Sequence, residues 1–101
     1  MALTFAMLAP LSVAQVITVT PSGSVTGGDS VAVGFADPKL AGQTITIFVS
    51  NGEPGPFHEE VPLVIKLDGD GKGSTSWIAD GSWDQAVFSG EGAARVSVVV
   101  N

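Results

Sequence analysis

The chain of 101 residues contains no cysteine, and only 14% of its residues are charged. Without cysteine it can form neither a disulfide framework nor a thiolate metal site or nucleophile, so its stability has to come from packing. Four lysines and arginines stand against ten acids, which gives a net charge of -6. Because this charge repels a phosphate backbone and an anionic lipid surface alike, nucleic acid is not an expected partner.

Sequence signatures of catalysis and nucleotide binding are missing as well. The chain has no G-x-S-x-G turn for a serine nucleophile, no G-x-x-x-x-G-K-[ST] loop and no dinucleotide-binding pattern. The one histidine, His58, has no second base and no cysteine with which to form a catalytic pair. We therefore expect a protein that is not an enzyme and needs no cofactor.

What the chain does have is alternation of hydrophobic and polar residues after Ala14, with no long stretch that keeps a helical period. Hydrophobic residues make up 45% of the chain, enough for the core of one domain. Pro62 cannot donate a ladder hydrogen bond, so its strand is expected to start or run along an edge. Turn residues separate the alternating runs, and strands are expected at 17–19, 31–35, 45–49, 61–67, 74–79, 83–89 and 94–100.

The spacing of these turns gives residues 16–101 a family resemblance. The region resembles the immunoglobulin-like domains of bacterial surface proteins and tailed-phage virions. The matching segments are Thr18–Gly23, Gly27–Val33, Gly42–Ile47, Leu67–Ser74, Gly81–Trp83, Gly90 and Val96–Val100. The resemblance implies an all-β, immunoglobulin-like sandwich of about seven antiparallel strands, without the disulfide and intersheet tryptophan of antibody domains.

The first fourteen residues are an almost wholly apolar run without charge, followed by the β domain at 15–101. The apolar stretch falls short of a convincing membrane span. One interpretation is a signal peptide cleaved after Ala14, although no lysine or arginine opens it. The other is a retained N-terminal arm.

In a retained arm, large and small side chains alternate as in a strand that sets one face into a groove. The large ones are Leu3, Phe5 and Met7, followed by Leu8. We expect the arm to add to a neighbouring molecule as a strand, with Pro10 supplying a bend. Each of these four side chains would contribute on the order of 1.5–3 kcal/mol when buried, before ordering costs. The alternative is that the arm pairs with its own domain.

Parity along the expected strands also places hydrophobic residues on the solvent face. Phe48, Val64 and Val99 should point outward. Scattered apolar surface is ordinary, but a cluster would form a patch for another chain. These three residues and the arm are the expected assembly interface.

Two polar segments are weak candidates for ligand binding. Asp68 and Asp70 lie in a glycine-rich turn that resembles a calcium loop, but it lacks further oxygen ligands, so a plain hairpin turn is the main expectation. His58 lies beside Glu59 and Glu60 in the loop 53–60. Neighbouring residues of an extended chain point in opposite directions, so we expect a solvated loop and no metal site.

Trp77 and Trp83 flank the Asp80-Gly81 turn. They are expected as core side chains, and the alternative is an exposed pair that stacks on a sugar ring. Together with Phe57 and His58 in the loop, they would form the contact surface of a secreted module that binds a glycan or a protein at the cell surface.

The sequence as a whole predicts a structural subunit of a surface assembly. The resemblance implies a virion protein that decorates a capsid or attaches to a tail, and a self-polymerising fibre is a second version. Its partner would be protein, either a capsid or tail protein or further copies of the chain. The secreted, cell-surface binding module is the alternative.

Overall fold

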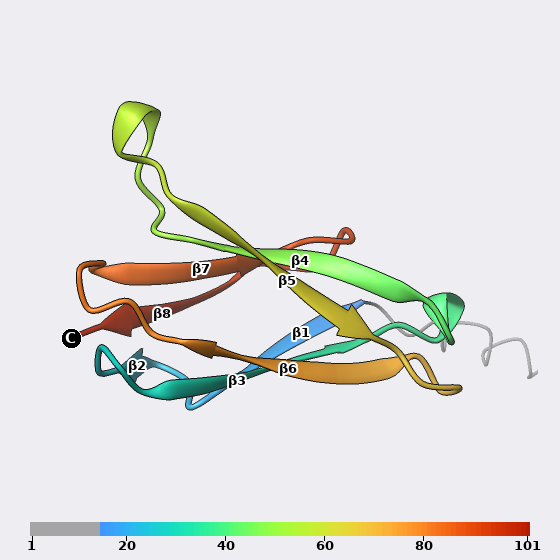
Figure 1. The fold of residues 1–101 in the computed structure, drawn as a ribbon. Helices are drawn as coiled ribbons and strands as arrows, with labels where there is room; N and C mark the ends of the chain where they lie inside the picture. Colours follow the sequence, from blue (N-terminus) through green and yellow to red (C-terminus); the bar gives the residue numbers. More distant parts are fainter. Residues whose placement is uncertain (1–14) are drawn as a thin grey trace, which may run out of the picture.

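Two β-sheets packed face to face account for most of residues 15–101, the part of the chain that the computed structural model describes (Figure 1). One sheet has three strands in the order β1-β3-β6, and the other has five in the order β2-β8-β7-β4-β5. The strands are β1 (Val16–Thr20), β2 (Ser24–Val25), β3 (Ser30–Ala36), β4 (Thr44–Ser50), β5 (Glu60–Lys66), β6 (Lys72–Ile78), β7 (Gln85–Ser89) and β8 (Val96–Val100). Two short 3-10 helices, η2 (Pro38–Leu40) and η3 (Gly55–Phe57), lie in loops.

The prediction of an all-β chain is confirmed, and most expected strands lie within a few residues of their expected positions. The structure adds β2, which the sequence analysis did not predict. This strand has two residues and pairs in parallel with β8, whereas the other strand pairs are antiparallel. So short a strand, between the turns at Ser22-Gly23 and Gly27-Gly28, leaves no alternation to detect.

The core lies between the two sheets and is built from alternate residues of the facing strands. In β3, for example, Val31, Val33 and Phe35 are buried and the residues between them face outward. The largest fully buried side chains are Phe88, Ile47, Ile65, Leu67, Val31, Val33 and Val49. Val61 departs from the prediction: it shares the inward parity of Leu63 and Ile65, yet it is 38% exposed.

The loops gather at two opposite ends of the sandwich. At the first, here called the loop end, loop 51–59 leaves β4, and Ala79 exchanges backbone hydrogen bonds with Gly28 and Asp29. At the second, the lysine end, the turn after β5 meets the η2 loop, since Asp37 N–H donates to the Gly71 carbonyl and Gly42 N–H to the Asp68 carbonyl. β3 and β4 run the length between these ends.

Within residues 15–101, no helix is long and apolar enough to cross a membrane.

Candidate functional site

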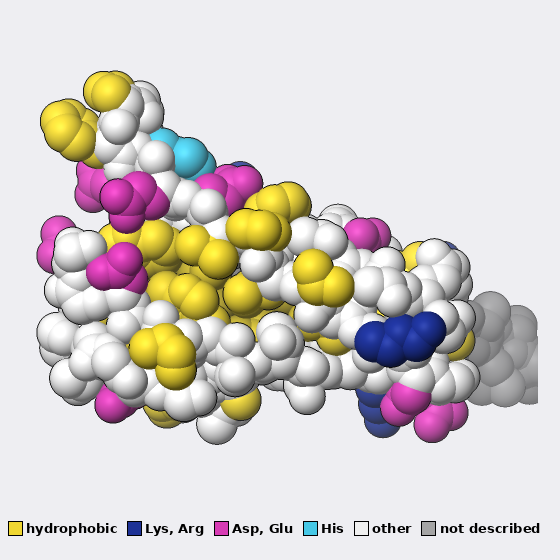
Figure 2. Space-filling view, in the orientation of Figure 1, with side chains coloured by type: hydrophobic (Ala, Val, Ile, Leu, Met, Phe, Trp, Pro, Cys, Tyr) yellow, Lys and Arg dark blue, Asp and Glu magenta, His cyan; other side chains and the backbone are white. Residues whose placement is uncertain are grey.

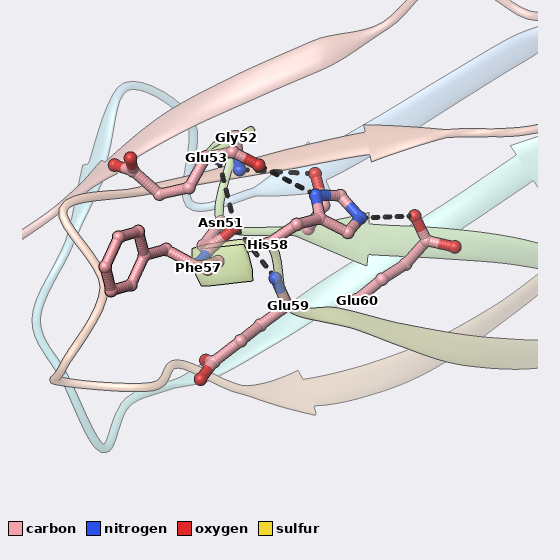
Figure 3. Close-up of polar contacts among 8 residues, drawn as sticks. Asn51, Gly52, Glu53, Phe57, His58, Glu59 and Glu60 are labelled. Carbon is pink, nitrogen blue, oxygen red and sulfur yellow. Dashed lines mark hydrogen bonds and ion pairs between the residues drawn. The ribbon is translucent and has the colours of Figure 1, made fainter. Parts of the chain in front are cut away.

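Loop 51–59, which joins β4 to β5, projects away from both sheets and carries η3 at its tip (Figure 1). Asn51 sits at its base, where its side chain is only 7% exposed. Its Nδ2 donates to the Phe57 carbonyl at 2.8 Å, and its Oδ1 accepts from the N–H groups of Glu53 and Glu59 at 3.0 and 3.1 Å (Figure 3). One buried amide therefore braces three points of the loop backbone.

Phe57 lies at the tip of this braced loop and is 76% exposed, the largest exposure among the large exposed hydrophobic residues of the described chain. Figure 3 shows its ring directed away from His58 and Glu60. Pro54 and Pro56, which both precede Phe57, restrict the backbone, and His58 N–H donates to the Gly55 carbonyl. An aromatic ring held in this way loses little backbone freedom on contact with a partner.

The two sides of the loop carry different polar contacts. His58 and Glu60 lie on one side, with 3.1 Å between Nε2 and Oε1, and His58 Nδ1 lies 2.9 Å from the Glu53 carbonyl oxygen (Figure 3). Glu59 points the other way and accepts a hydrogen bond from Trp83 Nε1. From the sequence, the side chains of His58, Glu59 and Glu60 were predicted not to converge. This prediction is right for Glu59, which points away from His58. It is wrong for Glu60, because residues two apart on an extended chain share a side.

Both acceptors at His58 favour the protonated ring. The backbone oxygen of Glu53 contributes most to the raised pKa of His58, followed by the hydrogen bond and charge of Glu60. Burial lowers the pKa of His58, because it disfavours the charged ring, but the side chain is exposed to solvent and this effect is smaller than that of the two hydrogen bonds. This pair stiffens the loop most when the imidazole carries its proton.

Beneath the His58 side of the loop, a groove of about 350 Å³ crosses the outer face of the five-stranded sheet. Ser50, Gln85 and Ser89 contribute polar side chains from the sheet, and Arg95 adds a positive charge. Glu53, His58 and Glu60 line it from the loop. The lining is polar, which suits a hydrated surface more than a site for an apolar ligand.

The outward-facing hydrophobic residues expected from parity are exposed, at 37% for Phe48, 61% for Val64 and 52% for Val99. Phe48 pairs with Pro62 in the register of β4 and β5, and Val64 lies two residues along β5. These three form one apolar patch. Val99 does not join it, because β7 lies between β8 and β4 and Val99 pairs with Gln85.

A second, smaller pocket of about 220 Å³ lies on the outer face of the three-stranded sheet, toward the lysine end. Gly34 of β3 has no side chain, and the side chain of Thr18 in β1 lies beside it, so that a Cβ at Gly34 would come within 2.6 Å of Thr18 Oγ1. Val16 and Ala36 form apolar walls. Lys72 of β6 stands at the rim. Sequence reasoning missed this pocket, although the small residues Ala32, Gly34 and Ala36 at alternate positions of one strand are its visible signal.

The two tryptophans belong to the core. Trp77 and Trp83 are 8% and 6% exposed, with their ring centroids 5.4 Å apart, and Trp77 also packs edge-on against Phe88. The core interpretation is confirmed, and the alternative of an exposed stacking pair is wrong because both indoles are enclosed between the sheets. Glu59 satisfies the Trp83 N–H, the one polar atom of that ring.

The acidic turn after β5 is a hydrogen-bonded hairpin turn. Asp68 Oδ1 accepts from the N–H groups of Asp70 and Lys72 at 2.8 and 3.0 Å, and these bonds lower the pKa of the Asp68 carboxyl. The backbone thus uses the oxygen that a calcium ion would need. No group of three or more potential metal ligands lies together in residues 15–101.

The expected arm residues Leu3, Phe5, Met7 and Leu8 lie outside the described residues. Comparison of the chain with models of protein families, with curated proteins and with solved structures found no match. The surfaces described above therefore provide the argument for function.

Proposed function

We propose that this chain is an immunoglobulin-like sandwich without enzymatic activity, which serves as a structural subunit of a surface assembly and joins its neighbours by strand addition. The strand order β1-β3-β6 and β8-β7-β4-β5 supports the immunoglobulin-like assignment, since two antiparallel sheets joined by crossing connections are its framework. The family resemblance favours a capsid or tail surface as the place of assembly.

The observation that carries this proposal is the uncovered edge of β6. This strand has seven residues, no proline, and no charge between Gly73 and Ile78. Its backbone pairs with β3 on one side only. Proteins usually blunt such an edge with charge, proline or a covering loop, so a long uncharged edge is a site for pairing with another chain.

The other edge strands are shorter or better protected. β5 contains Pro62 and carries Glu60 and Lys66 at its ends, and β2 has only two residues. β1 is also uncharged, but it has five residues and ends just before Pro21.

Figure 2 shows hydrophobic side chains in the hollow between β5 and β6. Val61 of β5, which shares the inward parity of Leu63 and Ile65, is exposed on this side. An added strand that pairs with β6 would therefore also cover apolar surface.

The arm at residues 1–14 has the composition for such a strand. Its large apolar side chains alternate with small ones and it carries no charge that would oppose burial. We propose that the arm of one molecule pairs with β6 of its neighbour, while the patch of Phe48, Pro62 and Val64 gives a second contact. A main-chain ladder supplies affinity, and the alternating side chains supply the register.

Deleting residues 1–10 and measuring the mass of the product in solution tests this proposal. We expect the shortened chain to stay folded and to form smaller assemblies than the full chain, because it lacks the strand that pairs with β6. A charged substitution on the edge, Thr75→Lys, should give the same loss, since one charge on an edge strand opposes pairing. If both variants assemble as well as the full chain, strand addition is wrong.

A further inference from the structure

The two ends of the molecule carry different charges. Six of the ten carboxylates lie at the loop end, namely Asp29, Glu53, Glu59, Glu60, Asp80 and Asp84. The same end contains no lysine, and Arg95 is the basic residue nearest to its acids, in the groove that it lines together with Glu53 and Glu60. Three of the four basic residues, Lys39, Lys66 and Lys72, lie at the lysine end, around the η2 loop and the turn after β5. Opposite ends of two copies therefore attract each other.

The lysine end also contains three carboxylates, Asp37, Asp68 and Asp70, and the first two accept hydrogen bonds within their own loops. Asp37 is buried and its side chain caps η2 through the Lys39 N–H. Asp68 is engaged by the backbone of its own turn. Lys72, at the rim of the pocket on the three-stranded sheet, makes no ion pair within 4.0 Å in the described structure.

The two ends also match in shape. The loop end presents one protruding aromatic ring, Phe57, with Glu53 and Glu59 near it. The pocket near the lysine end is apolar along Val16, Gly34 and Ala36, and measures about 220 Å³. A cavity of about 150 Å³ is enough to hold a benzene ring, so one phenylalanine ring fits.

We propose that copies of this chain associate head to tail, with Phe57 of one copy seated in the pocket between β1 and β3 of the next copy. Lys72 at the pocket rim then faces the acidic loop around Phe57. This inference rests on the proposed assembly function, for which it names a second copy of the chain as the partner. Such a contact joins unlike surfaces, so it does not close after two subunits and extends into a row.

The braced loop suits this contact. Asn51, Pro54 and Pro56 fix the backbone before binding, which reduces the ordering cost. A buried aromatic residue at the centre of a small contact usually carries much of its affinity. We therefore expect removal of the Phe57 ring to weaken association at least about tenfold.

Sedimentation velocity of the full chain over a range of concentrations tests the proposal. The wild-type protein should form a concentration-dependent series of oligomers, which becomes weaker as salt screens the contact between the two ends. Phe57→Ser should remove this series, and circular dichroism should confirm that the variant is folded. Val99→Ser is the matched control, since Val99 is also exposed but lies outside the proposed contact.

A second variant blocks the pocket and leaves the loop intact. Thr18 is exposed and lies directly opposite Gly34, so in Thr18→Trp the indole would cover the glycine and fill the pocket without disturbing the core. This variant should lose the head-to-tail series and keep only the association that depends on residues 1–10. A mixture of Phe57→Ser and Thr18→Trp chains retains one working pocket and one working loop, and should regain one head-to-tail contact per pair of chains.

The outcomes separate this inference from the proposed function. If the wild-type chain stays monomeric at about 1 mM, head-to-tail association is wrong. It is also wrong if Phe57→Ser and Thr18→Trp associate as the wild type does. If deletion of residues 1–10 prevents assembly while Phe57→Ser and Thr18→Trp associate as the wild type does, strand addition holds and the Phe57 contact is rejected.

Discussion

Asn51 is the residue on which the projecting loop depends. Its amide is buried and makes three hydrogen bonds to backbone atoms that no other described side chain contacts. The sequence indicated turn residues at Asn51-Gly52, followed by a solvated loop at 53–60. It did not show that the Asn51 side chain holds this loop together. Pro54 and Pro56 cannot donate ladder hydrogen bonds, so the strands do not continue into the loop.

We predict that Asn51→Ala destabilises the protein by about 1–3 kcal/mol, because it leaves two backbone N–H groups and one carbonyl without their partner. Urea denaturation followed by tryptophan fluorescence gives the free energy of unfolding. Gln43→Ala is the control, since Gln43 is an exposed amide at the lysine end. Equal stability of the two variants would show that Asn51 does not brace the loop.

His58 makes the loop sensitive to pH. Its raised pKa comes first from the Glu53 carbonyl and then from Glu60. A group whose pKa is raised in the folded state stabilises that state fully below its ordinary pKa, and the stabilisation is lost as pH rises through the raised value. The loop should therefore be most ordered in mildly acidic solution.

A titration of the His58 ring protons by NMR checks this expectation. The pKa should lie above the ordinary histidine value, and Glu60→Gln should lower it only in part, because the contact with the Glu53 carbonyl remains. Glu91→Gln, a distant acid in the turn between β7 and β8, should leave it unchanged. No difference between the two variants would mean that Glu60 does not interact with the ring in solution.

At the scale of elements, alternation predicted the long strands well because one face of each lies against the other sheet. Val31, Val33 and Phe35 are buried as expected. The same reasoning was wrong for Val61, because the opposite sheet does not cover the beginning of β5. Parity states which way a side chain points, but the size of the facing sheet decides whether it is covered.

The turn between β5 and β6 holds the lysine end together. Gly71 has a φ of +80°, and a Cβ there would collide with the Asp37 carbonyl of the η2 loop. Gly71→Ala should therefore lower the free energy of unfolding by at least about 1–2 kcal/mol. Gly69→Ala in the same turn is the matched control, since it meets no atom within 4 Å.

Thermal or urea denaturation of these two glycine variants measures the effect. We expect the Gly69 variant to unfold close to the wild-type midpoint. Similar losses in both variants would mean that the contact between the turn and the η2 loop contributes little to stability.

For the whole molecule, the sequence indicated an assembly role through the arm and through three outward-facing side chains. Pairing in the structure groups Phe48 with Val64 and leaves Val99 apart. The β1/β3 pocket and the exposed β6 edge were not anticipated, because both depend on which strands pair and which strands lie at the edges. Strand order is a property of the complete topology, which a local pattern does not encode.

The assembly proposal requires that residues 1–14 remain on the protein. We predict that the intact mass of the chain from its natural source includes them. A mass that corresponds to a chain beginning at Gln15 would show cleavage after Ala14, contradict strand addition by the arm, and favour a secreted binding module.

The brace at Asn51 grips the loop through main-chain atoms of Glu53, Phe57 and Glu59 rather than through their side chains. The identity of the tip side chain is thereby uncoupled from the shape that presents it. In the proposed contact, replacements at position 57 would alter what is recognised without any redesign of the scaffold, so mutation could readily diversify its specificity.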